Sequence, residues 1–464
     1  MGSDRSGMRI IVSFDTEDFT DPAANDVLLQ ICRTLTQRGV RACFGLVGEK
    51  ARFIRDLGRW DLVEALSAHE ICYHSDNHFL FPDETHRPRF ASEIVEECTW
   101  EEATRWLVAT EARGLADLES LFGERPITYL RTCGDSAPQI LEAYRQLGLR
   151  VFAYGPALYE RTRHIAWYAN SLCVSLPLIA EELTYAGRAP GDLDRVAAAN
   201  EDLVNVRFHP CRFISDKWWS EINYLDKPNP PTRPPYRLAP RLPAEETRKR
   251  LDNLGELVDY ARQRHGVEFT SYGEVERETR RDPPFLTRAQ VEAAARRVSE
   301  RMSFADAAGV TLSLAESFAA VVWANLRPEA ERVPLRRMVR PTALPGTGVG
   351  DPQGTVTGEQ ILSACRSAEE TIAAEGRVPD EVSLAGRLVP PAVLLRAAAA
   401  RLLGRSPIRL EPAPLYPEGF DEMLRKWEEA SFDLVAFFPH RNRPVPNTKL
   451  AIKLQYWTYK PASL

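Results

Sequence analysis

The stretch His74-Ser75-Asp76-Asn77-His78 follows a short apolar run that begins at Glu70 and ends at Tyr73. Its two imidazoles, four residues apart, supply two nitrogen atoms that can bind one metal ion. An acidic cluster, Asp15-Thr16-Glu17-Asp18, follows another apolar run near the start of the chain. Catalytic zinc sites use three protein ligands of these kinds and leave one position open for water. The two stretches together therefore predict the metal centre of a hydrolase.

Reactive side chains recur where predicted strands end, and this recurrence predicts the fold. We expect buried strands at residues 8–14, 40–47, 70–73, 127–130 and 202–208. Helical segments separate them, and this alternation favours parallel strands joined by crossovers. In α/β barrels the functional groups lie at the carboxyl ends of the strands. The acidic cluster, the histidine pair, Arg131 and His209 all fall at such ends, so we predict an α/β fold in which they meet.

The character of the chain changes at about residue 284. Residues 8–283 carry the reactive stretches and form the predicted catalytic domain. Residues 284–464 are rich in Ala and Arg, carry no reactive cluster and are expected to form a second, mainly helical domain. Two weak repeats within it, at about 286–340 and 356–412, each predict a helix, a short extended segment and another helix. Each repeat would need the other to bury its apolar face.

Composition excludes several classes of protein. The chain has 464 residues and a net charge of -6, which argues against a general nucleic-acid-binding protein because phosphate binding needs a basic surface. No run of 18 apolar residues occurs and residues 1–8 lack an apolar signal segment, so we expect no membrane span and a cytoplasmic location. The 8 cysteines form no C-x-x-C pair and are expected to be buried free thiols. Nothing in the sequence predicts an oligomeric state.

Four motifs, in their order along the chain, resemble those of the polysaccharide deacetylases, the NodB-homology family of carbohydrate esterases (family 4). They are Ser13-Phe14-Asp15-Thr16-Glu17-Asp18, His74-Ser75-Asp76-Asn77-His78, Arg131-Thr132-Cys133-Gly134 and Phe208-His209-Pro210. The resemblance covers about residues 8–280 and implies an irregular (β/α) barrel. It also implies an N-deacetylase that hydrolyses the linear amide bond of N-acetylated amino sugars in a polysaccharide or glycoconjugate. The implied cofactor is a divalent metal ion, zinc first, with cobalt or nickel as alternatives.

The resemblance implies a role for each matching residue. Asp15 would be the catalytic base, and Arg131 would hold it. His209 would be the general acid. His74 and His78 would bind the metal.

The carboxylate that completes the metal site has two candidates. The opening motif of the family usually has two adjacent aspartates, of which the second binds the metal, but here Thr16 follows Asp15. Alternation of side chains along a strand favours Glu17, which would face the same way as Asp15. A β-bulge would favour Asp18 instead.

Aromatic residues after His209 are the candidates for substrate binding. Trp218, Trp219 and Tyr236 lie in or near a proline-rich segment at 226–243. Their rings could stack on a sugar or could hold this segment in place, and both roles remain open. A group of basic residues elsewhere is expected to form a solvent-exposed face: Lys50, Arg52, Arg55 and Arg59.

Two other functions remain as alternatives. The first is an amidohydrolase of the same fold that acts on a small non-sugar amide or a cyclic imide. The second is a non-catalytic glycan-binding protein. The C-terminal repeats faintly resemble pseudomurein-binding repeats, which would imply an accessory part that binds a cell-wall glycan.

Overall fold

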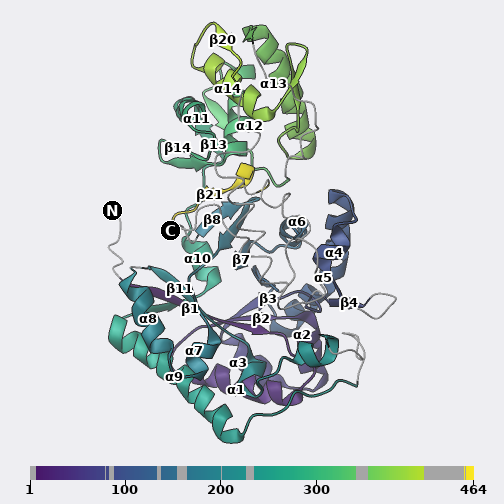
Figure 1. Ribbon diagram of the computed structural model, residues 1–464, viewed down its shortest axis with the longest axis vertical. Coiled ribbons are helices and arrows are strands. Elements are labelled where there is room, and N and C mark those ends of the chain that lie inside the picture. Colours follow the sequence, from purple (N-terminus) through teal and green to yellow (C-terminus); the bar gives the residue numbers. More distant parts are fainter. Residues whose placement is uncertain are drawn as a thin grey trace. The chain divides into compact units, whose positions relative to one another are not determined.

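The computed structural model describes residues 7–78, 80–82, 88–132, 137–153, 165–199, 201–225, 235–340, 354–411, 454 and 456–464. It divides into two compact units (Figure 1). The first consists of Met1–Asp135, Ala143–Gly155 and Cys173–Glu278. The second consists of Ser136–Glu142, Pro156–Leu172 and Thr279–Leu464. The change of character expected at about residue 284 falls close to Thr279, but two earlier segments of the chain also belong to the second unit.

The first unit is built on a curled sheet whose strands run parallel wherever they pair. Its strands are β1 (Arg9–Thr16), β2 (Cys43–Leu46), β3 (Glu70–Tyr73), β6 (Thr128–Leu130), β7 (Val151–Ala153), β10 (Leu178–Ile179), β11 (Leu203–Phe208) and β12 (Glu268–Thr270). They follow the order β10-β11-β1-β2-β3-β6-β7, with β12 also paired to β1. The α/β class predicted from the sequence is therefore confirmed.

Helices of the first unit connect these strands, as parallel pairing requires. They are α1 (Pro22–Gln37), α2 (Gly48–Asp56), α3 (Trp60–Ser67), α4 (Ala91–Val95), α5 (Trp100–Phe122), α7 (Glu181–Tyr185), α8 (Ala189–Ala198), α9 (Ala244–His265) and α10 (Tyr272–Glu278). Short elements are the strands β4 (Leu80–Pro82) and β5 (Pro88–Phe90), the 3-10 helix Pro210–Phe213 and the π-helix Glu221–Leu225. Two elements, α6 (Gln139–Gln146) and β9 (Ser171–Val174), include residues of both units.

The centre of the sheet is β1, all eight residues of which are buried. Burial along the whole strand is typical of a parallel strand that is covered on both faces. Phe14 stacks on Phe44 of β2 and on Phe208 of β11, with ring centroids 4.7 and 5.2 Å apart. The packing fixes the register of three neighbouring strands, and so it fixes which residues follow them at the carboxyl edge.

The second unit is mainly helical, and its two repeats have the same order of elements. The first repeat contains β13 (Phe285–Thr287), α11 (Arg288–Glu300), β14 (Ala305–Ala307), β15 (Val310–Leu312), α12 (Leu314–Leu326) and β16 (Arg332–Pro334). The second contains β17 (Thr355–Val356), α13 (Gly358–Glu375), β18 (Val382–Leu384), β19 (Arg387–Val389), α14 (Pro391–Leu402) and β20 (Ile408–Arg409). In both, the first strand pairs with the last and a hairpin lies between the helices.

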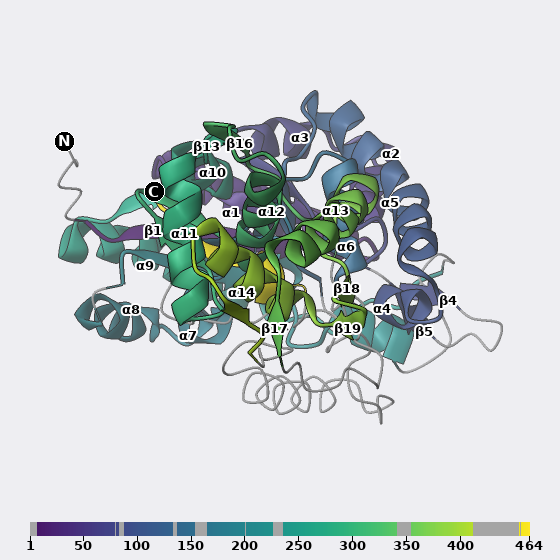
Figure 2. The same ribbon diagram turned by 90° about the horizontal axis from the view of Figure 1, so that it is seen from above.

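Local hydrogen bonds explain why the two repeats look alike in sequence. Thr287 and Thr357 each begin a helix with a capping box, in which the glutamine three residues later bonds back to the threonine. The helices of one repeat pack against those of the other, α11 on α14 and α12 on α13 (Figure 2). In the same unit β8 (Ile165–Tyr168) pairs antiparallel with β21 (Lys460–Pro461). Among the described residues no helix has the length and apolar character needed to cross a membrane.

A buried histidine in the first unit predicts a pH dependence of stability. His69 accepts a hydrogen bond from the Ala42 backbone nitrogen at Nδ1 and contacts the Thr36 hydroxyl through Nε2, so its ring is held neutral. Burial lowers its pKa from 6.5 to about 4. Below pH 6.5 the unfolded chain therefore binds a proton that the folded chain does not. The free energy of unfolding should fall by up to about 3 kcal/mol between pH 6.5 and pH 4 because of this residue.

Urea unfolding of the wild type and His69→Gln at pH 7 and pH 5 measures this contribution. The variant should lose about 2 kcal/mol less between the two pH values than the wild type. Val63→Ala, on the half-buried face of α3, carries no titratable group; it is the control and should keep the wild-type difference. Equal losses in the wild type and His69→Gln would contradict the prediction.

Candidate metal centre and active site

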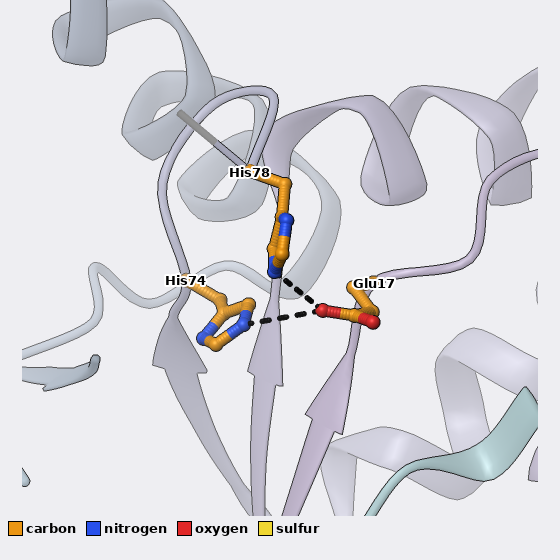
Figure 3. A group of neighbouring side chains, drawn as sticks. All are labelled: Glu17, His74 and His78. Atoms are coloured by element: carbon orange, nitrogen blue, oxygen red, sulfur yellow. Dashed lines mark ion pairs between the residues drawn. The ribbon is translucent and has the colours of Figure 1, made fainter. Parts of the chain in front are cut away.

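Glu17, His74 and His78 lie together just beyond the carboxyl ends of β1 and β3 (Figure 3). Glu17 Oε2 is 2.5 Å from His78 Nε2 and 3.7 Å from His74 Nε2. One ligand atom from each residue lies within 4.8 Å of the other two, and all three residues are buried. Positive φ angles of 72° at Ser75 and 63° at His78 turn the loop so that the second imidazole approaches the first.

Hydrogen bonds from outside the trio orient its donor atoms. His74 Nδ1 is 2.8 Å from the carbonyl oxygen of Leu130, which can only accept, so Nδ1 carries a hydrogen and Nε2 faces Glu17. Trp219 Nε1 donates to Glu17 Oε1 at 3.0 Å, which leaves Oε2 facing the imidazoles. Burial alone would raise the pKa of Glu17, but His78 and His74 hold it well below its usual value. Two imidazole nitrogens and a carboxylate oxygen in this arrangement fit a divalent ion of the zinc type.

Asp18, the other carboxylate that the sequence left open, is engaged elsewhere. Its Oδ1 accepts hydrogen bonds from the backbone nitrogen and hydroxyl of Thr20 at 2.8 and 2.7 Å. Its carbonyl oxygen accepts from Lys50 Nζ at 2.6 Å. Asp18 therefore closes the turn between β1 and α1, and the geometry favours Glu17 as the ligand.

The prediction that Lys50, Arg52, Arg55 and Arg59 form a solvent-exposed face is wrong for Lys50 and Arg52. Lys50 is 1% exposed and Arg52 is 5% exposed. Lys50 supports the turn at Asp18, while Arg52 pairs with Asp76 in the histidine loop and with Asp117 of α5, both at 2.7 Å. These two cations hold the two loops that carry the metal-site residues.

Asp15 and His209 form the second part of the site. Phe14 of β1 pairs with Phe208 of β11, so the next residue of each strand lies at the same edge. His209 Nε2 is 3.4 Å from Asp15 Oδ2. Among the described residues, Asp15 Oδ1 is buried without a hydrogen-bond partner. Although burial opposes the ionised carboxylate, His74, His209 and Arg207 together lower the pKa of Asp15.

Glu181, the first residue of α7, holds His209 from the other side. Its Oε2 accepts from the His209 backbone nitrogen at 2.7 Å and lies 3.2 Å from His209 Nδ1. Burial would lower the pKa of His209, but Glu181 and Asp15 raise it well above its usual value. The imidazole is therefore a cation between two carboxylates, with Nε2 directed at Asp15. Sequence analysis missed Glu181, because no motif surrounds it.

The guanidinium beside Asp15 comes from Arg207. Its NH1 lies 3.8 Å from Asp15 Oδ2. Arg207 precedes His209 by two residues on an extended segment, so this alternation was the signal that sequence analysis missed. Arg131 directly follows β6 and is half-buried, and its expected role of holding Asp15 stays a prediction.

The aromatic candidates occupy different places. Trp219 is buried, and its hydrogen bond to Glu17 favours a supporting role over stacking on a sugar. Trp218 is half-buried and lies perpendicular to His209 at 4.5 Å between ring centroids. Tyr236 is half-buried and contacts Phe19 at 5.8 Å. Residues 226–234 of the proline-rich segment lie outside the described residues, and 235–243 form no helix or strand.

Trp219→Phe tests the support that Glu17 receives. Phenylalanine keeps an aromatic ring at this position but cannot donate the hydrogen bond to Glu17 Oε1. Glu17 then becomes free to rotate away from the imidazoles. Loss of such an outer partner typically weakens metal binding about 10–100-fold. Equilibrium dialysis with zinc measures the change, and Trp323→Phe in the second unit is the control. An unchanged zinc affinity would show that the hydrogen bond does not orient Glu17.

Comparisons with known proteins give distant structural matches only. No family model and no curated protein matches the sequence. A putative polysaccharide deacetylase from Mycobacterium smegmatis is 15% identical over 60% of this chain and 92% of that chain, with a TM-score of 0.38. A peptidoglycan deacetylase from Bacillus subtilis is 14% identical over 59% and 92%, with a TM-score of 0.32. A 4-alpha-glucanotransferase from Thermococcus litoralis is 10% identical over 59% and 40%, with a TM-score of 0.39.

These TM-scores are too low to assign a function to this chain. The matches are to more than one kind of carbohydrate-active protein. They give no support to the likeness between the C-terminal repeats and pseudomurein-binding repeats. The functional argument therefore depends on the geometry of the site.

Proposed function

We propose that this chain is a metal-dependent hydrolase that removes acetyl groups from N-acetylated amino sugars of a polysaccharide or glycoconjugate. The observation that carries the proposal is the convergence of five groups at one edge of the sheet. A candidate ligand trio, Glu17, His74 and His78, lies beside a carboxylate and a protonated imidazole, Asp15 and His209. The order of the four sequence motifs supports the same reaction.

Each group has a task in amide hydrolysis. Glu17, His74 and His78 would hold a divalent ion, zinc first, which when bound supplies Lewis acidity to a carbonyl oxygen and to water. Asp15, ionised and held through Oδ2, takes the proton of the attacking water. His209 carries a proton on Nε2 and gives it to the nitrogen of the departing amine as the C–N bond breaks. Glu181 keeps the other side of the imidazole in place.

A second candidate is an amidohydrolase that acts on a small non-sugar amide or a cyclic imide. The observation in its favour is burial, since the side chains of Asp15, Glu17 and His74 are all at most 5% exposed. An enclosed reaction centre suits a small molecule better than a polymer. In the first proposal, the exposed parts of Trp218 and Tyr236, both half-buried, are the candidates for contact with a sugar ring.

Acetate release tests the proposal. The purified chain is assayed on N-acetylated glycan oligomers and small acetamides, then after chelation, and again with zinc or cobalt restored. The proposal predicts acetate from the sugar substrates, loss on chelation and recovery with metal. Turnover of small amides alone would support the second candidate. Glycan binding that survives His74→Ala, together with no turnover of any panel substrate by the metal-loaded wild type, would overturn the enzymatic proposal.

A further inference from the structure

A second group of ligand-type side chains lies at the opposite, amino-terminal edge of the same sheet. Cys43 is the first residue of β2, Glu70 is the first residue of β3, and Cys72 follows Glu70 by two residues. Cys43 pairs directly with Glu70 across the two strands. Because side chains alternate along a strand, all three point to the same face of the sheet. Their two sulfur atoms and a carboxylate oxygen lie within 4.8 Å of one another, and all three residues are buried.

The Glu70 carboxylate is fixed between the two thiols. Its Oε1 accepts from the Thr128 hydroxyl at 2.8 Å and lies 3.6 Å from Cys72 Sγ. Its Oε2 accepts from the Gly273 backbone nitrogen at 2.8 Å and lies 3.9 Å from Cys43 Sγ. A β-carbon at Gly273 would stand 3.1 Å from Oε2, so glycine is what allows this close approach. Hydrogen bonds of this kind orient a ligating carboxylate in metal sites.

The hydrogen-bond donors to this buried carboxylate are all neutral: a hydroxyl, a backbone nitrogen and two thiols. Within the described part of the chain, no lysine, arginine or histidine forms an ion pair with Glu70. Thiols are weak hydrogen-bond donors, so the two long S–H contacts add little to the hydrogen bonds from Thr128 and Gly273. Two sulfurs and an oxygen that converge in this way are the donor set of a soft or borderline cation, and they disfavour magnesium and calcium.

We propose that Cys43, Glu70 and Cys72 form a structural binding site for one thiophilic divalent cation of the zinc and cadmium class. Binding replaces both S–H protons with two metal–sulfur bonds and one metal–oxygen bond, and the two protons leave to solvent. Two protons, with a total charge of +2, leave as one dication enters. Binding therefore adds no net charge to the interior. The ion would join β2 to β3 below the candidate reaction centre and is independent of the proposed hydrolase function.

Cadmium is the probe, because its bonds to thiolates give an ultraviolet charge-transfer band that imidazole and carboxylate ligands do not give. The full chain is unfolded under reducing conditions and refolded with cadmium, since the cluster is buried. In the wild type the band should saturate at one thiolate-bound cadmium per chain, whether or not Glu17, His74 and His78 hold a second ion. Cys43→Ser/Cys72→Ser should lack the band, and Cys365→Ser, which alters a buried cysteine of α13, should keep it.

Thr128→Val keeps both thiols and guards against a folding defect in the double variant. It removes the hydroxyl that orients Glu70, and the dissociation constant for cadmium should rise about 10–100-fold. A wild type without the band, a band that survives the double cysteine substitution, or an unchanged constant in Thr128→Val would overturn the proposal. None of these readings depends on acetate release, so failure of the proposed function leaves them intact.

Discussion

Asp15→Asn should reduce the rate of acetate release about 10³-fold and leave zinc bound. A general base typically contributes about 10²–10⁴-fold, and asparagine has the size of aspartate but cannot take the proton of water. The ligand trio does not include Asp15, and its Oδ2 faces His209 and Arg207. Steady-state kinetics on the best substrate of the acetate panel measures the loss. Zinc content by equilibrium dialysis is measured on the same preparation.

Ser13→Ala is the matched control for this substitution. Ser13 lies two residues before Asp15 on β1, is equally buried, and bonds to Asn205 of β11. Its removal should change the rate less than about tenfold, because it disturbs the same strand pair without touching the reacting groups. An Asp15→Asn variant that loses zinc together with activity would place Asp15 among the ligands and refute its role as the base. An Asp15→Asn variant with full activity would show that Asp15 is not the general base.

The edge at which the reactive groups meet was predictable from local sequence. Apolar runs end at Asp15, His74 and His209. The carboxyl ends of neighbouring parallel strands lie at the same edge of the sheet, so these residues were expected to lie close together. The choice between Glu17 and Asp18 was not predictable, since it depends on distant partners. Trp219, about two hundred residues away, bonds to Glu17, whereas Lys50 and Thr20 occupy Asp18.

Residues that support the reactive groups carry weaker signals in the sequence. Lys50 and Arg52 belong to a basic group that looks solvated, yet α2 buries both against anionic or carbonyl partners. Glu181 comes from a helix of five residues with no motif around it. Such residues act through contacts between segments far apart in the chain, so only the folded arrangement identifies them.

In the second unit too, features set by neighbouring residues were predictable and features set by distant contacts were not. Its repeats were visible because capping boxes and hairpins are encoded by neighbouring residues, such as Thr287 with Gln290 and Thr357 with Gln360. The segments Ser136–Glu142 and Pro156–Leu172 also belong to this unit. Their membership depends on contacts over more than a hundred residues, which local patterns do not carry.

His209→Asn should separate the attack of water from the departure of the amine. The proton on His209 Nε2 is needed when an amine leaves, because an amide nitrogen is a poor leaving group without it. We expect a loss of about 10²–10⁴-fold on an N-acetylated sugar. A phenolate leaves from an activated acetate ester without a proton, so on this substrate the same variant should lose less than about tenfold. Initial rates on the two substrates measure the difference.

Asp15→Asn is the reference for this comparison, since its loss should be similar on the amide and on the ester. Water must be deprotonated in both reactions, whereas only the amide needs a proton at the leaving group. The distance of 3.4 Å between His209 Nε2 and Asp15 Oδ2 also allows a different role, in which the imidazolium only holds the base in place. Equal losses of His209→Asn on both substrates would establish that positioning role and reject the general acid. A loss confined to the amide would show that His209 gives the proton to the departing amine.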